Sequence, residues 1–325
     1  MSESWLKPTR CAICGGEGNA SEIYPARLER EDLRPEIFSA RRKPDGVHYR
    51  LVKCQSCGLV RSDPAADARQ IAEIYAESGF DYAGEVENLT ATYGRYLRDV
   101  IALGGVRGSL LEIGCGNGFF LEEALRQGFR DVRGIEPSAD AIRRASPAIA
   151  ARIAPGVFRR GTFEPGTFDV ICLFQVLDHL PDPARSLEAA CEMLKPGGML
   201  LCLNHDVQAM SARVMGEKSP IVDVEHTFLF GKDTLRRLLE SSGFRIERIG
   251  TAWNRCSLRY LLHLIPVSDR LKTPWIGLAD RSRLGRVSVW LPLGNLFGIA
   301  SRPAAVSGGA RGNERADEAS RNSVL

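Results

Sequence analysis

The most constraining feature of this chain is a regular alternation of short apolar runs with helix-like segments between residues 109 and 249. Continuous apolar strands joined by helices indicate a mainly parallel sheet that is covered on both faces. In such a sheet a ligand binds at the carboxyl ends of the strands. We predict strands at 109–113, 132–136, 168–174, 199–203 and 244–249, and helices at 119–127, 139–145, 183–194 and 232–241.

The first of these strands ends in a glycine turn with an acidic residue before it. Gly114, Gly116 and Gly118 alternate, unlike the wider spacing of dinucleotide sites, and glycine permits a tight turn and the close approach of a ligand. Glu112 would repel a pyrophosphate but attract an ammonium or sulfonium group. Glu136 ends the next strand, where a carboxylate can accept hydrogen bonds from both hydroxyls of a ribose.

The motifs at 112–118, 134–138, 168–171 and 194–198 resemble, in order, those of the class I S-adenosylmethionine (SAM)-dependent methyltransferases. The resemblance implies a Rossmann-like, mainly parallel seven-stranded sheet with helices on both faces, whose last two strands form an antiparallel hairpin. A Rossmann-like sheet with a different ligand, or a degenerate fold that no longer binds SAM, is the alternative. The residues implied in SAM binding are Glu112, Gly114, Gly116, Asn117, Gly118, Glu136, Phe163, Phe174 and Gln175.

Two Cys-x-x-Cys-Gly motifs mark the N-terminal part of the chain. Cys11 and Cys14 form the first pair and Cys54 and Cys57 the second, and glycine after each pair permits the turn of a zinc knuckle. Four thiolates leave no open position on a tetrahedral ion, so we predict a structural Zn²⁺ in a small zinc ribbon and not a catalytic metal. A redox dithiol is the alternative, but it would not need two copies.

Composition and charge restrict the remaining classes of protein. The net charge of +3 is too balanced to indicate a nucleic-acid or membrane binder by itself. We see no signal-peptide core and no apolar run of membrane-spanning length, and nine Cys is an odd number, so we expect a cytoplasmic chain with reduced thiols. The expected parts are a zinc ribbon (1–63), a helical linker or lid (64–105), a methyltransferase domain (106–302) and a disordered tail (303–325).

Histidines provide the candidates for a catalytic base. His179 follows the strand predicted at 168–174, and His205 follows the strand predicted at 199–203. Glu225-His226 precedes the last predicted helix, so all of these residues should lie at the ligand-binding edge. We predict catalytic roles for His179, His226 and Glu225, with a structural hydrogen bond as the alternative for each.

The two strands of the expected hairpin are 244–249 and 293–300. The segment 250–292 between them is too long for a simple hairpin loop and is basic and apolar. We consider two interpretations of this insert. It is a cap over the substrate cleft, or it is a lid that contacts a phosphorylated substrate or an anionic membrane surface.

The chain combines a zinc module, a SAM-binding core and a Glu-His pair. In this combination it resembles bacterial methyltransferases that act on sugars and saccharides. The resemblance implies a small-molecule acceptor, most simply a nucleotide-linked sugar, methylated on oxygen or carbon. Asp223-Val224 replaces the aromatic residues of the carbon-methylating branch, which puts carbon methylation in doubt. An RNA methyltransferase with a zinc module and a non-catalytic binding scaffold are the alternatives, although the residues at 174–178 argue against RNA-base chemistry.

Overall fold

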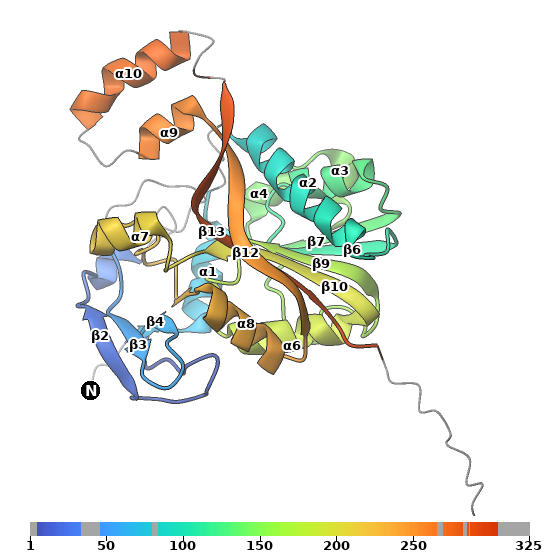
Figure 1. Cartoon of the computed structure of the whole chain (residues 1–325), viewed down its shortest axis with the longest axis horizontal. Coiled ribbons are helices and arrows are strands. Elements are labelled where there is room, and N and C mark those ends of the chain that lie inside the picture. Colours follow the sequence, from blue (N-terminus) through green and yellow to red (C-terminus); the bar gives the residue numbers. More distant parts are fainter. Residues whose placement is uncertain are drawn as a thin grey trace, which may run out of the picture.

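The computed structural model describes residues 5–33, 46–79, 84–264, 269–281, 285 and 287–304 of the 325-residue chain. A seven-stranded sheet forms its centre, in the order β12-β13-β10-β9-β6-β7-β8 (Figure 1). Strand β13 runs antiparallel to both of its neighbours, and the other pairs are parallel, which confirms the predicted fold. The strands are β6 (Ser109–Ile113), β7 (Asp131–Glu136), β8 (Ile153–Pro155), β9 (Phe168–Phe174), β10 (Leu194–His205), β12 (Arg245–Ser257) and β13 (Ser288–Ser301).

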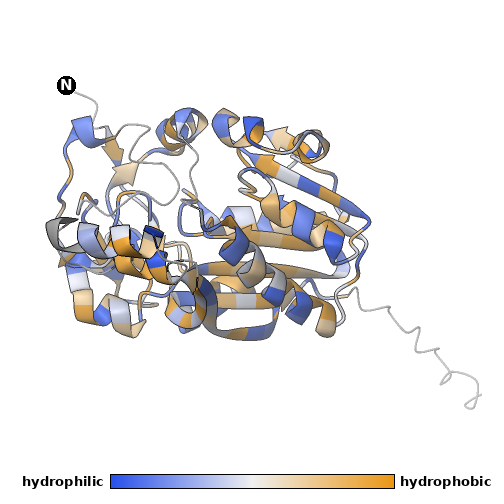
Figure 2. Cartoon of the chain, turned by 90° about the horizontal axis from the view of Figure 1, so that it is seen from above, coloured by the Kyte–Doolittle hydropathy of each residue, from blue (hydrophilic) through white to orange (hydrophobic). Residues whose placement is uncertain are grey.

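Helices cover both faces of this sheet because its strands bury side chains on both sides. In β9, Val170 and Cys172 pack with the helices of one face, whereas Ile171 and Leu173 pack with those of the other. The helices alternate polar and apolar residues (Figure 2), as expected of helices that bury one side. One face carries α2 (Val86–Ala102) and α3 (Phe119–Arg126), and the other carries α6 (Pro183–Met193) and α8 (Lys232–Ser241). Two short helices, α4 (Ala139–Arg143) and α5 (Pro147–Ala150), lie between β7 and β8 along the chain.

The N-terminal part forms a second sheet that also takes in a strand from far along the chain. Its order is β11-β4-β3-β2, and Arg61 of β4 pairs with Phe228 of β11. The zinc-ribbon segment therefore shares hydrogen bonds with the chain just before α8. The strands are β2 (Ala20–Tyr24), β3 (Leu51–Cys54), β4 (Val60–Ser62) and β11 (Phe228–Leu229); β1 (Leu6–Lys7) pairs with β5 (Ala65–Ala66), a short helix η1 spans Arg30–Asp32, and α1 (Ala68–Glu77) follows.

The C-terminal hairpin is longer than the strands predicted at 244–249 and 293–300. Strands β12 and β13 remain paired to Ser257 and Ser288, across a register shift between Ala252 and Asn254. Only α9 (Leu258–Leu264) and α10 (Asp269–Arg281) project beyond the sheet in the part of 250–292 that the structure describes (Figure 1). No described helix is long and apolar enough to cross a membrane. The tail predicted at 303–325 falls, from residue 305 on, outside the described residues.

Candidate active site

A cavity of about 600 Å³ lies at the carboxyl ends of the parallel strands, as the fold predicts. One half is lined by the turns that follow β6, β7 and β9. The other half is lined by α1, by α7 (Met210–Met215) and by the loop between η2 (Gly216–Lys218) and β11. The cavity therefore joins the predicted SAM site to a wall of histidines.

Glu136 organises the first half. Its carboxylate accepts hydrogen bonds from the backbone N–H groups of Gly116 (2.8 Å) and Ser138 (2.9 Å), although the side chain is buried. Burial raises the pKa of Glu136, and these two hydrogen bonds oppose the rise. Gly114 and Gly116 take left-handed φ angles of 70° and 54°, which lets the turn lie against the carboxylate.

Glu112 is a buried acid whose Oε2 atom has no hydrogen-bond partner among the described residues. Burial and the neighbouring Glu136 raise the pKa of Glu112 well above its ordinary value. A buried acceptor without a partner is costly unless a ligand supplies a donor. The two carboxylates and the glycine turn therefore fit a ligand with a positive charge and a ribose, which SAM provides.

The chain after β9 completes this half. Phe174 stacks on Tyr93, with ring centroids 4.0 Å apart and an interplanar angle of 4°. Gln175 has a left-handed φ of 57°, which is uncommon for a residue other than glycine and costs free energy. Its buried Oε1 atom has no partner among the described residues, and both Phe174 and Gln175 line the cavity.

The structure divides the predicted SAM residues into two groups. Five of them line the cavity: Gly114, Gly116, Glu136, Phe174 and Gln175. Glu112, Asn117, Gly118 and Phe163 lie behind its wall. A Cβ atom on Gly118 would come within 2.3 Å of Ile149, so this glycine serves close packing. Phe163 packs edge-on against Phe168, with ring centroids 5.2 Å apart, and Phe158 lines the cavity instead.

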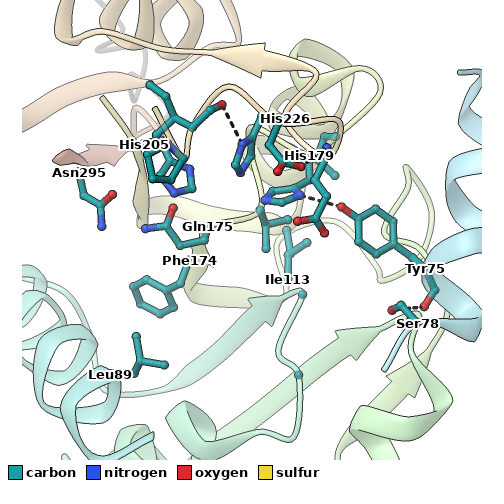
Figure 3. A pocket seen from close by; sticks show the side chains of 18 of the residues that line it. Tyr75, Ser78, Leu89, Ile113, Phe174, Gln175, His179, His205, His226 and Asn295 are labelled. Atoms are coloured by element: carbon teal, nitrogen blue, oxygen red, sulfur yellow. Dashed lines mark hydrogen bonds between the residues drawn. The ribbon is translucent and has the colours of Figure 1, made fainter. Parts of the chain in front are cut away.

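Three histidines, His179, His205 and His226, gather in the second half (Figure 3). They lie around the buried carboxylate of Asp178. The ring centroids of His179 and His226 lie 4.8 Å apart, and those of His205 and His226 lie 4.5 Å apart. Asp178 Oδ2 accepts a hydrogen bond of 2.6 Å from Nδ1 of His205. Its Oδ1 atom has no hydrogen-bond partner among the described residues and lies 3.8 Å from Nε2 of His179. The predicted convergence of the three histidines is thus present in the structure.

Burial sets the protonation state of this cluster. It lowers the pKa of His179, and it lowers the pKa of His226 well below the ordinary value, with the other two imidazoles adding to the effect at His226. Burial alone would raise the pKa of Asp178, but the imidazoles of His179, His205 and His226 hold it far below its usual range. Burial therefore favours the neutral form of His179 and His226, whereas the neighbouring imidazoles favour the ionised form of Asp178.

Sequence reasoning missed Tyr75 and Asp178. The Tyr75 hydroxyl pairs with Nδ1 of His179 at 2.7 Å, across 104 positions of the chain, and burial raises the Tyr75 pKa well above its ordinary value. No pattern in α1 distinguishes Tyr75 from a packing residue. Asp178, by contrast, directly precedes His179, and an acid beside a histidine after a buried strand could have been chosen. Glu225 lines the cavity as predicted.

The two cysteine pairs meet at the N-terminal sheet. The four Sγ atoms all lie within 4.8 Å of one another; the Cys11–Cys57 distance is 3.3 Å and the Cys14–Cys54 distance is 3.6 Å. Sulfurs around a tetrahedral zinc ion at 2.3 Å are about 3.8 Å apart. The turns close by hydrogen bonds from the N–H groups of Gly15 and Gly58, both with positive φ. The donor set and its spacing therefore fit a structural Zn²⁺.

Comparison with known proteins agrees with this geometry. The sequence model of a family described as a methyltransferase domain matches residues 86–249, half of the chain. The chain is similar to a ubiquinone biosynthesis O-methyltransferase of Methylococcus capsulatus, with 30% identity over 166 residues that cover 47% of this chain and 70% of the relative. The corresponding enzyme of Caulobacter vibrioides is 33% identical over 131 residues, 38% of this chain and 52% of the relative.

Among solved structures, a SAM-dependent methyltransferase from Archaeoglobus fulgidus has a TM-score of 0.47 and 18% identity, covering 68% of this chain and all of that one. The family match covers the parallel strands β6 to β10 and the glycine turn on which the SAM assignment rests. The chain belongs to the methyltransferase-domain family. It is a SAM-dependent methyltransferase.

Proposed function

We propose that this enzyme transfers the methyl group of SAM to a hydroxyl oxygen of a small molecule bound against the histidine wall. The observation that carries the proposal is that Glu136, the glycine turn and the three histidines line one cavity. The similarity to O-methyltransferases of ubiquinone biosynthesis supports oxygen as the acceptor atom. Bound SAM supplies a methyl group on a positively charged sulfur.

His179, His226 and Glu225 are the residues we assign to the acceptor. The two imidazoles are neutral, so each can accept a hydrogen bond from an acceptor hydroxyl. Glu225 lines the same wall and takes the proton that the hydroxyl loses. The main role of the site is to align the acceptor oxygen with the methyl group, because the rate of an in-line displacement depends strongly on the alignment of the reacting atoms.

The N-terminal cysteines hold a structural zinc ion in this proposal. Cys11, Cys14, Cys54 and Cys57 supply four thiolates with no open position. The ion would fix β3 and its neighbour β4, and β4 pairs with β11 next to the histidine wall. Its contribution is therefore to the shape of the acceptor half and not to the reaction.

Two finer predictions stay open to test, one on the acceptor and one on segment 250–292. The nucleotide-linked sugar expected from the zinc module and the Glu-His pair has no support from the relatives' names. Most of the residues that line the acceptor half are apolar, among them Ile71, Met215 and Ile221. The predicted contact of segment 250–292 with an anionic membrane rests on exposed residues of α10, where Trp275 is 64% and Leu278 is 59% exposed.

The test is a SAM-consumption assay with two panels of acceptors, phenols including 1,2-dihydroxybenzenes and nucleotide-linked hexoses. We expect formation of S-adenosylhomocysteine together with an O-methylated product identified by mass spectrometry. Glu225→Gln should lower turnover without changing SAM affinity, whereas Glu164→Gln, on an exposed loop outside the cavity, should change neither. Methylation of carbon or nitrogen, or full activity of Glu225→Gln, would refute the assignment.

A further inference from the structure

The histidine wall contains three potential metal-ligating atoms that lie close to one another. They belong to Asp178, His179 and His226, each of which offers one ligand atom, and the three atoms all lie within 4.8 Å of one another. Asp178 Oδ1 is buried without a hydrogen-bond partner among the described residues. A buried carboxylate oxygen in that state costs free energy unless another group neutralises it.

The opposite atom of each side chain is already held. Nδ1 of His226 lies 3.0 Å from the carbonyl oxygen of Ile221, and since a carbonyl only accepts, Nδ1 carries the proton and Nε2 keeps its lone pair. Nδ1 of His179 pairs with the Tyr75 hydroxyl. Asp178 Oδ2 accepts from His205. Metal-binding histidines and carboxylates are held in this way, by a partner on the atom that does not bind the ion.

The charge around the cluster also suits a cation. Among the described residues that line the cavity, Glu136, Asp223 and Glu225 are acidic, and Arg255 is the single Lys or Arg. Asp178 adds a further carboxylate directly behind the imidazoles. Two of the ligand atoms, Asp178 Oδ1 and His179 Nε2, are separated by 3.8 Å. Donors about 2.1 Å from a tetrahedral ion are about 3.4 Å apart, so a small side-chain movement closes the site.

We infer that Asp178, His179 and His226 form a second metal site, which binds a divalent transition-metal ion of the zinc or iron(II) class. Imidazole and carboxylate donors suit these ions, and three protein ligands leave at least one position open, in contrast to the closed four-cysteine site. Because His179 and His226 line the cavity, the open position faces the acceptor.

The role of this ion rests on the proposed function. The acceptor hydroxyl reaches the two histidines through the ion, which lowers the pKa of that hydroxyl. Its proton passes to Glu225 and then to water. A lone pair of the oxygen forms the O–CH₃ bond while the S–CH₃ bonding pair stays on sulfur, which leaves S-adenosylhomocysteine and the methyl ether.

Cobalt titration tests the site without reference to activity. The purified protein is stripped with a chelator and titrated with Co²⁺, whose bonds to thiolate give an intense near-ultraviolet charge-transfer band that imidazole and carboxylate do not give. We expect two equivalents to bind to the wild type, of which only one gives this band. Asp178→Asn and His226→Gln should each bind one equivalent and keep the band. His205→Gln, which removes a supporting hydrogen bond, should weaken the second site by about 10–100-fold.

Asp223→Asn is the matched control. Asp223 lies on the same wall, and its Oδ1 accepts a hydrogen bond from the Glu225 N–H that an asparagine oxygen can also accept. This variant should bind two equivalents. SAM affinity, measured by calorimetry, reports whether each variant is folded. If Asp178→Asn does not bind SAM, the test of the second site is made with His226→Gln.

A wild type that binds one equivalent, or an Asp178→Asn protein that binds two, overturns the second metal site. The proposed function is tested separately, since the acceptor assay reports methylation whether or not cobalt binds. We also expect the wild-type protein to bind SAM but to lose turnover when only the thiolate site holds an ion. Turnover should return when the second ion is restored. Full turnover without the second ion would overturn the role assigned to it.

Discussion

The two halves of the cavity are built in different ways. The SAM half comes largely from one stretch of chain, in which Glu112, the glycine turn and Glu136 follow two neighbouring strands. The acceptor half brings together Tyr75, His179 and His226 from three distant segments, and the bond between Tyr75 and His179 spans 104 positions. A local motif fixes the first half, whereas only the complete fold assembles the second.

Because of this difference, the acceptor half depends on the N-terminal sheet, whereas the SAM half does not. The N-terminal sheet holds the histidine wall through β4: the Ser62 N–H donates to the carbonyl of Thr227 at 2.8 Å, and the Ser62 hydroxyl donates to the carbonyl of His226 at 3.3 Å. Among the described residues, no such hydrogen bond joins the N-terminal sheet to the glycine turn. The halves should therefore respond differently to damage.

Loss of the zinc-ribbon cysteines should have the largest effect. Cys54→Ser removes one of four thiolates, and structural zinc sites supply much of the free energy that folds small modules. We expect turnover to fall by about 100-fold or more, because a displacement of about 1 Å at the acceptor is enough for that loss. SAM affinity should stay close to wild type. Zinc content, calorimetric SAM binding and turnover are measured on one preparation.

Cys191→Ser is the control for this experiment, since Cys191 is half-buried and lies outside the four-cysteine group. It should retain zinc and turnover. Equal loss of SAM binding and turnover in Cys54→Ser would contradict the separation of the two halves.

Glu136→Ala should damage the SAM half in turn. The variant removes the acceptor for the Gly116 and Ser138 N–H groups as well as the predicted ribose contact. We expect SAM affinity to weaken by about 1–3 kcal/mol, roughly 5- to 150-fold, which is the range for hydrogen bonds to a charged group. The metal content should not change. Calorimetric titration with SAM measures the effect, and an unchanged dissociation constant would exclude Glu136 as a ribose ligand.

The same contrast explains how much could be predicted from the sequence. The sheet and the glycine turn were predictable, because apolar runs such as 168–174 report burial on both faces and because glycines mark the turn. The approach of His179, His205 and His226 to one edge was also predictable, since each follows a strand or precedes a helix of the recognised pattern.

The partners of those histidines were not predictable. Tyr75 reaches His179 only because α1 packs over the cavity, and a tyrosine in an amphipathic helix gives no sign of that. The continuation of β12 and β13 to Ser257 and Ser288 was missed for a related reason, because pairing with the partner strand decides where an edge strand ends. Phe163 was placed by resemblance alone, and in the structure it packs against Phe168.

Tyr75→Phe should produce a smaller change that is confined to the acceptor half. The variant keeps the ring but removes the hydroxyl that pairs with Nδ1 of His179, so the imidazole loses its orientation. We expect kcat/KM for the acceptor to fall by about 5- to 10-fold, equivalent to about 1 kcal/mol, with SAM affinity unchanged. Steady-state kinetics with SAM saturating measures this.

The matched control is Tyr96→Phe, because the Tyr96 hydroxyl accepts a hydrogen bond of 2.7 Å from the N–H of Trp253, away from the histidines. Tyr96→Phe should lower the free energy of unfolding by about 1 kcal/mol, as the loss of one hydrogen bond predicts, but leave kcat/KM close to wild type. A loss of activity equal to that of Tyr75→Phe would mean that the effect is one of general stability.

Asp169→Asn should have the smallest effect on either half and so provides a reference for both. Asp169 lies at the start of β9, the end of the sheet opposite the cavity, and it accepts hydrogen bonds from the Ser109 N–H at 2.7 Å and from Lys195 Nζ at 2.7 Å. Burial alone would raise the pKa of Asp169, but Lys195 and Ser109 lower it below its ordinary value. We expect the variant to lose about 1–2 kcal/mol of the free energy of unfolding at neutral pH.

The sign of the pH dependence follows from that lowered pKa. The carboxylate stabilises the fold above the ordinary pKa of an aspartate, and this stabilisation disappears as the pH falls through the lower pKa of the folded state. Urea unfolding at neutral pH and at about pH 3 should therefore show a difference between wild type and variant that shrinks on acidification. Turnover and SAM affinity at neutral pH should match those of wild type. A constant difference at both pH values would mean that Asp169 acts through packing and not through its charge.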